Sequence, residues 1–447
     1  MAPLSKAGAA LAALRDELSG EVFAPGDAGY DAARAGSDAR AEGRPAVIAR
    51  CADAGDVVRA VRFARDLDLP VAVGSALGYG GVVVDLRRMD GVSVDPEART
   101  VRIEGGATMS RLDRACRPYG LAVPGAPDSG AGVAGFVLGG GTGWLDRAFG
   151  LAVDGLRGVE LVTADAEPIR AGPDEHPQLF WALHGGGGNF GVATALTLDL
   201  RELPEFAATL LLYRPERGPE VVRAFREAIE RGPDRLSGTL LYLTGPPGSV
   251  PEELVGRPVC GALVTYAGGV GTLRGLVSPL LALPVVGELP YAEALGMFDT
   301  RPGPRSLSSA ECLTGLPDDL VHVYCSLGAR MPVPTGTRHL LFPQGGAVAA
   351  GPHDYPVPFR DAPWVAHPSA RWEDPADDER TLAWVWEVRS GVAPWSTGDV
   401  PLDLIGDEGA ERVRAGLGVG NMLRLEKVKR AYDPDNVFRF GHNVRPL

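Results

Sequence analysis

The hydrophobic pattern of the first hundred residues predicts a β-α-β unit. Residues 46–49 are a short apolar run typical of a strand, and residues 57–64 place valine and alanine at helical spacing. A proline ends this helix, and the β-branched runs at residues 71–73 and 82–84 favour two more strands. The glycine-rich bend between these two runs lies where a nucleotide-binding fold would turn backbone N–H groups toward phosphates.

The rest of the chain shows two further patterns. Residues 100–104 alternate as a strand does, and two long glycine-rich connections follow at residues 125–143 and 185–191. After these, strand and helix patterns alternate, which favours a second α/β domain with an antiparallel sheet. Its expected strands are residues 209–213, 239–243, 262–266 and 339–342, and its expected helices are residues 219–231 and 273–281. A stretch rich in tryptophan and proline, residues 352–395, is expected to wrap around the outside.

The length and composition fit a folded protein of two domains. The chain has 447 residues, of which 45% are apolar and 23% are charged. Its formal net charge of −13, without any run of lysine and arginine, disfavours nucleic acid and anionic membranes as partners. Residues 1–20 are typical of an amphipathic helix and lack the long apolar core of a signal peptide, so we expect a cytoplasmic protein.

Cysteine and histidine are scattered along the chain. There are five cysteines without a C-x-x-C pair, which favours reduced, mostly buried thiols in a chain without a secretion signal. The seven histidines show no H-E-x-x-H motif and no zinc-ligand spacing, so we expect no metal site.

Five stretches carry a resemblance to a known family, and they follow the family's order along nearly the whole chain. They are PGDAGYDAAR (25–34), GVAGFVLGGGTGWLDRAFGLAVDGL (132–156), LFWALHGGGGNFGVAT (179–194), FRDAPW (359–364) and KRAYDPDNVFRFGHN (429–443). This ordered set resembles the berberine bridge enzyme-like branch of the PCMH-type (vanillyl-alcohol oxidase) superfamily of FAD-linked oxidases.

The resemblance implies an α+β fold. Residues 1–200 would form a PCMH-type FAD-binding domain of two α/β subdomains, to which residues 405–447 return. Residues 201–404 would form a substrate-binding domain, with an antiparallel sheet covered by helices. In the family, two glycine-rich loops run beside the dinucleotide, and the matching residues are Gly139, Gly140, Gly141, Gly143, Gly186, Gly187 and Asn189. These glycines are also explained by the turns alone, and both interpretations stay open.

The sequence departs from the family pattern at three places that concern flavin binding and catalysis. The family's Arg-Gly-Gly-Gly-His loop, whose histidine is a common covalent flavin anchor, is absent, and only residues 74–81 connect the two strands. No cysteine lies between Cys116 and Cys260, where bicovalent relatives have the second anchor, and Asp128 would place negative charge near a diphosphate. Pro401 stands where the family often has its catalytic tyrosine, and a proline cannot accept a proton.

Together, these departures favour an enzyme that works without flavin. Our first hypothesis is a redox-neutral cyclase that uses no cofactor and catalyses a cycloaddition or rearrangement of a polyketide-like natural product in the interdomain cleft. The alternatives are an oxidoreductase that binds FAD non-covalently and a non-catalytic metabolite-binding protein. All three take a small molecule as partner, and the sequence leaves a homodimer open.

Few residues are candidates for the chemistry. Asp403 lies where the family keeps catalytic polarity, His184 precedes a glycine loop, and His339 flanks a strand expected to face the cleft. The candidates for the substrate pocket are Tyr79, Gln344 and Trp395. Each of these residues also has an ordinary structural explanation, as a solvated carboxylate, a satisfied histidine, an exposed strand residue or a packing aromatic.

Overall fold

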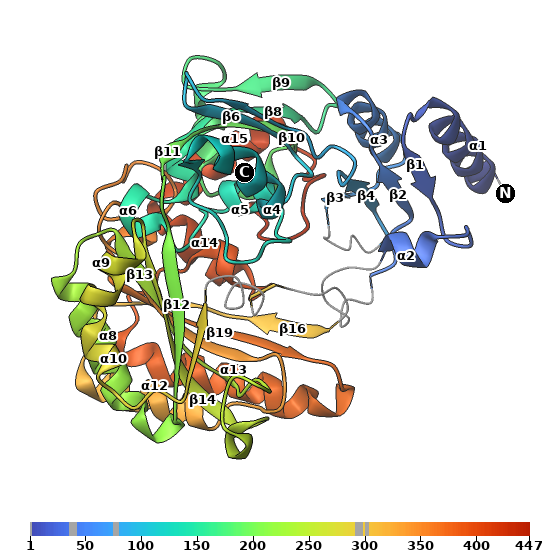
Figure 1. Ribbon diagram of the computed structural model, residues 1–447. Helices are drawn as coiled ribbons and strands as arrows, with labels where there is room; N and C mark the ends of the chain where they lie inside the picture. Colours follow the sequence, from blue (N-terminus) through green and yellow to red (C-terminus); the bar gives the residue numbers. More distant parts are fainter. Residues whose placement is uncertain (1, 35–42, 75–79, 291–297, 300–303) are drawn as a thin grey trace.

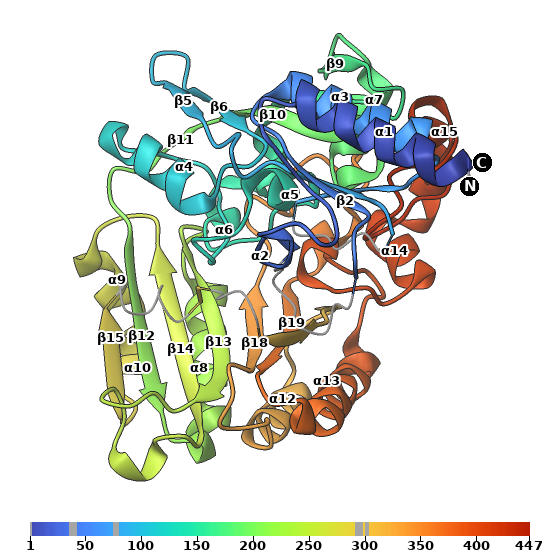
Figure 2. The same ribbon diagram turned by 90° about the vertical axis from the view of Figure 1, so that its right-hand side faces the viewer.

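Three main sheets and a C-terminal segment make up the fold (Figures 1 and 2). The computed structural model describes residues 2–34, 43–74, 80–290, 298–299 and 304–447. Two smaller sheets lie at one end of the molecule and the largest sheet lies at the other (Figure 1). The expected α+β architecture is therefore confirmed.

The first sheet contains the predicted β-α-β unit. Its strand order is β1-β2-β4-β3, in which β2, β4 and β3 are parallel and β1 is antiparallel to β2. The elements are α1 (Ala2–Glu17), β1 (Glu21–Phe23), α2 (Tyr30–Arg34), β2 (Val47–Arg50), α3 (Ala54–Asp66), β3 (Val71–Val73) and β4 (Val82–Asp85). Asp53 caps α3, and the buried valines of α3 pack on the sheet, as their helical spacing predicted.

The second sheet is antiparallel, with the order β5-β6-β10-β8-β9. Its strands are β5 (Val92–Asp95), β6 (Thr100–Glu104), β8 (Leu156–Val162), β9 (Pro168–Ala171) and β10 (Val192–Asp199), and β7 (Leu121–Ala122) pairs with β11 (Arg201–Glu202). Its helices are α4 (Met109–Cys116), α5 (Val133–Leu138), α6 (Asp146–Phe149) and α7 (Pro177–Leu183). α5 buries Val133 and Val137 in the core and leaves Gly132 and Gly135 exposed on its other side, which positions both glycines at the site described below.

The third sheet has eight strands and is antiparallel. Its order is β15-β12-β14-β13-β18-β19-β16, and β17 also pairs with β19. Its strands are β12 (Ala207–Tyr213), β13 (Leu236–Thr244), β14 (Pro258–Tyr266), β15 (Gly287–Pro290), β16 (Arg305–Ser308), β17 (Glu311–Leu313), β18 (Arg338–Pro343) and β19 (Trp364–Trp372). Its helices are α8 (Gly218–Arg231), α9 (Val270–Leu276), α10 (Ser278–Leu281), α12 (Asp318–Ala329) and α13 (Asp378–Val392). The four predicted strands are present, whereas the helix predicted at 273–281 is divided at Val277, two residues before Pro279.

The stretch rich in tryptophan and proline does not wrap around the outside, so that prediction was wrong. It contains β19, which lies inside the third sheet between β18 and β16, and α13, which packs against β19. Trp364, Trp372 and Trp384 are each less than 5% exposed. Proline misled the prediction because Pro368 occupies a strand position, where proline is rare.

The C-terminal segment returns to the second sheet. It contains α14 (Ala410–Leu417) and α15 (Met422–Tyr432). Lys429 of α15 is fully buried, and its Nζ donates to the carbonyl oxygen of Asn189 at 2.7 Å and pairs with Asp433 at 2.6 Å. The Asn189 side chain in turn donates to the carbonyl of His442 and accepts from the N–H of Val444. The tail is thus fastened to the second glycine-rich loop.

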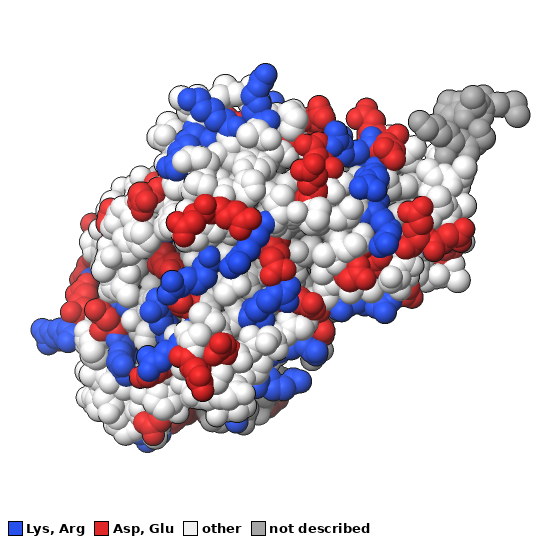
Figure 3. All heavy atoms as spheres, turned by 90° about the horizontal axis from the view of Figure 1, so that it is seen from above, with Lys and Arg blue, Asp and Glu red and all other residues white. Residues whose placement is uncertain are grey.

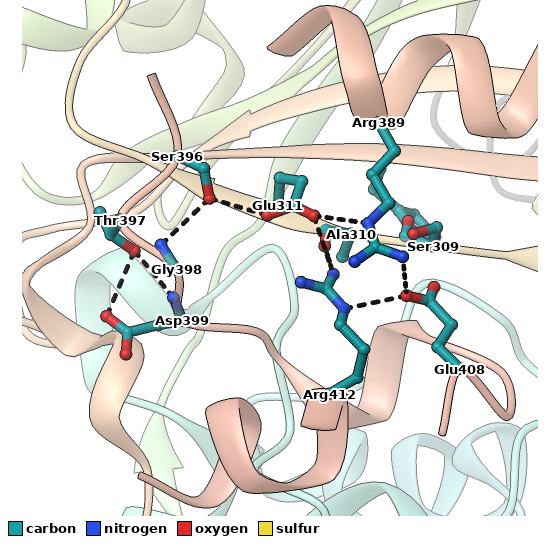
Figure 4. A network of polar contacts seen from close by, with 11 residues as sticks. Ser309, Ala310, Glu311, Arg389, Ser396, Thr397, Gly398, Asp399, Glu408 and Arg412 are labelled. Atoms are coloured by element: carbon teal, nitrogen blue, oxygen red, sulfur yellow. Dashed lines mark hydrogen bonds and ion pairs between the residues drawn. The ribbon is translucent and has the colours of Figure 1, made fainter. Parts of the chain in front are cut away.

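A buried ionic network ties the third sheet to the C-terminal segment (Figure 4). Glu311 of β17 and Glu408 each bind two arginines, Arg389 of α13 and Arg412 of α14, with N···O distances of 2.9–3.1 Å. Ser396 also donates to Glu311 at 2.7 Å. The chain between these anchors, residues 397–407, is called the Asp403 loop here. The loop contains a 3₁₀ turn, Leu402–Leu404.

The surface is charged but mixed. On the face shown in Figure 3, acidic and basic side chains are interspersed, without a continuous basic area. All five cysteines are free and buried, as predicted. In the described part of the chain, no helix has the length and apolarity needed to cross a membrane, and no three metal-ligating side chains are grouped.

Candidate functional site

Two neighbouring cavities meet in the interior. The first, of about 620 Å³, lies among the first two sheets, the glycine-rich loops and the C-terminal tail. The second, of about 920 Å³, lies between the first glycine-rich connection, residues 125–143, and the open face of the third sheet. Gly132, Gly135 and Asp403 line both cavities. We call the first the cofactor cavity and the second the substrate cavity, because their walls differ in the ways described next.

Several of the predicted glycines are required by the fold itself. Gly140 and Gly141 have φ of +124° and +81°, and a Cβ on Gly141 would lie 2.5 Å from the Cβ of Ala152. A Cβ on Gly143 would lie 2.2 Å from a carbonyl oxygen, and one on Gly186 would lie 2.4 Å from another. These four glycines are explained by tight turns and close packing, whatever the cavity holds. Gly140 and Gly141 do not line either cavity, and Gly143 lines the substrate cavity.

Three other glycines have no such internal reason. Gly132, Gly135 and Gly188 have ordinary φ values, and a Cβ on any of them would meet no protein atom within 4 Å. All three line the cofactor cavity, so a side chain there would project into it. Glycine at these positions keeps the cavity wide and its backbone N–H groups accessible, which is how a protein accommodates a dinucleotide. This cradle fits the FAD that the family binds.

The cofactor cavity also has positive charge. Arg34 lines it, and the Nε of Arg34 is buried without a hydrogen-bond partner among the described residues. Arg87 lines it as well, although Arg87 is paired with Asp85 at 2.7 Å. The prediction that Asp128 lies near the diphosphate site was wrong, because Asp128 lines the substrate cavity. A cation for an anionic ligand is therefore present despite the missing Arg-Gly-Gly-Gly-His loop.

No side chain is suited to covalent attachment of a flavin in the described wall of the cofactor cavity. The described lining residues include no cysteine, and their one histidine is His442. Its Nε2 lies 2.9 Å from the carbonyl oxygen of Leu402 and is therefore engaged.

Asp403 stands at the junction of the cavities. One of its carboxylate oxygens, Oδ2, accepts the backbone N–H of Thr142 at 2.9 Å, and the other, Oδ1, has no partner among the described residues. Burial raises the pKa of this carboxyl to about 6, against the opposing effect of the Thr142 hydrogen bond. A carboxylate with an unused oxygen and a pKa near neutrality can accept a proton from a ligand.

One face of the third sheet forms a wall of the substrate cavity. Along β19, His367, Ser369 and Arg371 line the cavity, while the alternate residues point into the helix-covered core. On β18 the lining residues are Arg338, Leu340 and Phe342. A buried sheet face is normally apolar, so polar residues at every second position of β19 indicate a surface built to bind something.

His367 offers a hydrogen-bond acceptor in this wall. Its Nδ1 lies 2.8 Å from the carbonyl oxygen of Ser309, which can only accept, so Nδ1 carries the proton and Nε2 is left as an acceptor. Burial lowers the pKa of His367 to about 4, which keeps the ring neutral at pH 7.

Most of the predicted catalytic and pocket residues lie outside both cavities. His339 is fully buried, stacked on Tyr324 and edge-on to Trp384, on the opposite face of the third sheet. His184 is buried at the end of α7, where its ring stacks on Tyr355 and its Nδ1 contacts the carbonyl of Phe180. The catalytic role predicted for these two histidines was wrong, because their rings do not reach either cavity. Side-chain alternation on β18 and the packing of α7 direct both rings into the core.

Two of the three residues predicted to line the substrate pocket also lie outside both cavities. The side chain of Gln344 is buried against the carbonyls of Phe359 and Ala362, and Trp395 packs on the helix-covered core of the third sheet. Neither lines a cavity. Tyr79 lies outside the described residues. Of the predicted loop residues, Gly139, Gly186, Gly187 and Asn189 line the cofactor cavity.

The functional residues that the sequence reasoning missed are Arg34, Gly132, Gly135, Gly188, Arg338, His367 and Arg371. The sequence does contain a pattern that indicates two of them, His367 and Arg371. In the stretch WVAHPSARW, polar residues recur at 367, 369 and 371, which is the period of a strand with one polar face.

Comparisons with known proteins agree with this geometry. The family described as FAD binding domain matches residues 45–172, and the family described as berberine and berberine like matches residues 408–445. The (R)-6-hydroxynicotine oxidase of Paenarthrobacter nicotinovorans is 30% identical, over 96% of this chain and 97% of its own. An FAD-linked oxidoreductase of Aspergillus terreus is also 30% identical, over 88% of this chain and 87% of its own.

Solved structures show the same fold. The crystal structure of 6-hydroxy-D-nicotine oxidase from Arthrobacter nicotinovorans superposes with a TM-score of 0.84 at 27% identity, covering 96% of this chain and 99% of that one. The BBE-like 1 protein of Physcomitrella patens superposes with a TM-score of 0.85, covering 98% and 99%, at 19% identity. The second likeness concerns the fold alone.

Proposed function

Because the chain belongs to the berberine bridge enzyme-like family of FAD-linked oxidoreductases, we propose that it is an oxidoreductase that binds FAD non-covalently and oxidises a small organic molecule. The observation that carries this proposal is the meeting of two cavities at Asp403. A dinucleotide in one cavity and a substrate in the other would then approach each other beside a proton acceptor.

The cofactor cavity offers what a dinucleotide requires. Gly132, Gly135 and Gly188 would leave room for it, and Arg34 would face its phosphates with an unused N–H donor. The Asn189 side chain holds the second glycine-rich loop against the C-terminal tail, so the wall is preorganised. These features replace part of what the missing loop supplies in other members of the family.

The chemistry is divided between cofactor and chain. Bound FAD supplies a two-electron acceptor. Asp403, when ionised, accepts the proton that a substrate O–H or N–H group loses as the neighbouring carbon is oxidised. The neutral His367 can orient the same group by accepting a hydrogen bond at Nε2. The two residues would take the place of the tyrosine that the family often has where this chain has Pro401.

FAD binding is the direct test. The purified protein is titrated with FAD, and bound flavin is measured after ultrafiltration and again after release by heat. Gly188→Leu should weaken FAD binding at least about tenfold, because its side chain would fill the cavity at a cost of several buried ligand contacts. The control is Gly271→Leu, an exposed position of α9 where a Cβ also meets no atom within 4 Å.

One observation favours a second candidate, the flavin-independent cyclase of our first hypothesis. The connection between β3 and β4 has only eight residues, Gly74 to Gly81, and lacks the Arg-Gly-Gly-Gly-His sequence. The relatives are named as FAD-linked oxidoreductases, which supports the flavin-dependent proposal better. Wild-type protein that binds no FAD at the highest soluble concentration would overturn the flavin-dependent proposal and leave the cyclase and the non-catalytic metabolite-binding protein.

A further inference from the structure

The wall of the substrate cavity contains an arginine that no described carboxylate neutralises through an ion pair. Arg338 is the first residue of β18 and lines the cavity with Leu340 and Phe342. Among the described residues, no carboxylate forms an ion pair with it, and its close partner is the ring of Phe298, whose centroid lies 5.0 Å from Cζ. An arginine lying over a ring keeps its fork of N–H donors available for an anion.

The charged side chains that act on Arg338 are one arginine and two carboxylates. The charge of Arg371 lowers the pKa of Arg338, while the charges of Asp128 and Asp299 raise it. Asp128 accepts the N–H of Gly130 and Asp299 accepts the N–H of Ser129, so these carboxylates are partly engaged elsewhere. Burial and Arg371 together lower the pKa of Arg338 to about 10, so the guanidinium stays charged at pH 7.

The rest of the wall of the substrate cavity carries hydroxyl groups and aromatic rings. Hydroxyl groups come from three strands of the third sheet, and aromatic rings come from both sides of the cavity. The hydroxyl residues of these strands are Ser237, Thr239, Ser306, Ser308 and Ser369, and the aromatic residues are Phe136, Trp144, Phe298, Phe342 and Trp386. A ligand that satisfies both sets has an apolar, preferably aromatic, body and one acidic end.

We propose that the substrate is an aromatic carboxylic acid, and that Arg338 binds its carboxylate through paired N–H···O hydrogen bonds. This inference rests on the proposed function in treating the cavity as the substrate site. Binding of the acid itself requires no flavin, so it can be measured on the protein with or without FAD.

The test compares an acid with its neutral isostere. Phenylacetate and phenylacetamide are titrated into the protein, and binding is measured by calorimetry and by the fluorescence of the tryptophans that line the cavity. The wild type should bind phenylacetate at least about tenfold more tightly than phenylacetamide. Arg338→Gln should abolish this preference, and Arg338→Lys should retain part of it, because a lysine keeps the charge but not the fork.

Controls separate binding from folding. Arg330→Gln removes an exposed arginine that pairs with Glu387 outside the cavity, and it should bind like the wild type. Circular dichroism and thermal unfolding show whether each variant is folded, and if Arg338→Gln is not, the partial loss in Arg338→Lys decides. Equal affinity for acid and amide, or an unchanged preference in the arginine variants, would overturn the inference. Loss of FAD binding with an intact preference for the acid would overturn only the proposed function.

Discussion

Asp403 makes the strongest residue-scale prediction, because its pKa near 6 lies within an accessible pH range. If ionised Asp403 accepts the substrate proton, the turnover of the FAD-loaded enzyme should rise as the pH increases through about 6 and then level off. Asp403→Asn should remove this rise and lower the rate by a factor of about 10²–10⁴. Steady-state rates across this pH range measure both effects.

The same residue allows a check that does not depend on turnover. The pKa of Asp403 is higher in the folded protein than its ordinary value of 3.8, so the ionised carboxyl opposes folding. Its contribution to stability is present below pH 4 and is lost as the pH rises through about 6. Asp403→Asn should therefore stabilise the protein by an amount of order 2 kcal/mol at pH 8 and by almost nothing at pH 4. An equal effect at both pH values would contradict the assigned pKa.

At the scale of elements, the sequence gives strand positions more reliably than it gives faces. The strand at 339–342 was predicted, and the structure extends it by one residue at each end. The side chains of this strand alternate between its two faces, so the strand's bounds do not say which set faces the cavity. The structure shows which set does. Arg338, Leu340 and Phe342 therefore face the cavity, and His339 faces the helices. A single sequence contains no direct signal of which face is covered.

The glycine-rich loops show a second limit of the sequence. The family pattern located both loops, but it could not separate glycines required by tight turns from glycines that keep a cavity open. Gly141 and Gly188 look alike in the sequence, and only the space around each Cβ distinguishes them. In the same way, a family position located Asp403, whereas its partner Thr142 lies 261 residues away in sequence.

The ionic network at Glu408 makes an element-scale prediction. The Glu408 side chain is 1% exposed and binds both Arg389 and Arg412, so Glu408→Gln leaves these two arginines to share Glu311. We expect a loss of about 3–5 kcal/mol in the free energy of unfolding, measured with urea. The control is Glu387→Gln, which breaks an exposed pair with Arg330 and should cost at most about 1 kcal/mol. Similar losses in both variants would show that the network does not hold the Asp403 loop.

At the scale of the whole molecule, the cofactor cavity joins distant parts of the chain. Its wall includes Arg34 near one end, both glycine-rich loops and Gly441 near the other. A ligand that binds only this assembled site stabilises the whole fold by mass action. FAD at about 100 times its Kd should add about 2.7 kcal/mol and raise Tm by about 3 °C, as calorimetry can measure. Gly188→Leu should show no such rise, and a rise of equal size in this variant would place FAD elsewhere.

The fastening of the C-terminal tail to Asn189 has a consequence for biosynthesis. The tail residues Phe438, Phe440 and His442 complete the cavity wall, yet they are made some 250 residues after Asn189. At a ribosomal rate of about 5–20 residues per second, this delay amounts to roughly 10–50 s. During that interval the nascent chain has its glycine-rich loops but no closed pocket. A dinucleotide that binds this site would therefore bind only after the tail has been synthesised and has docked.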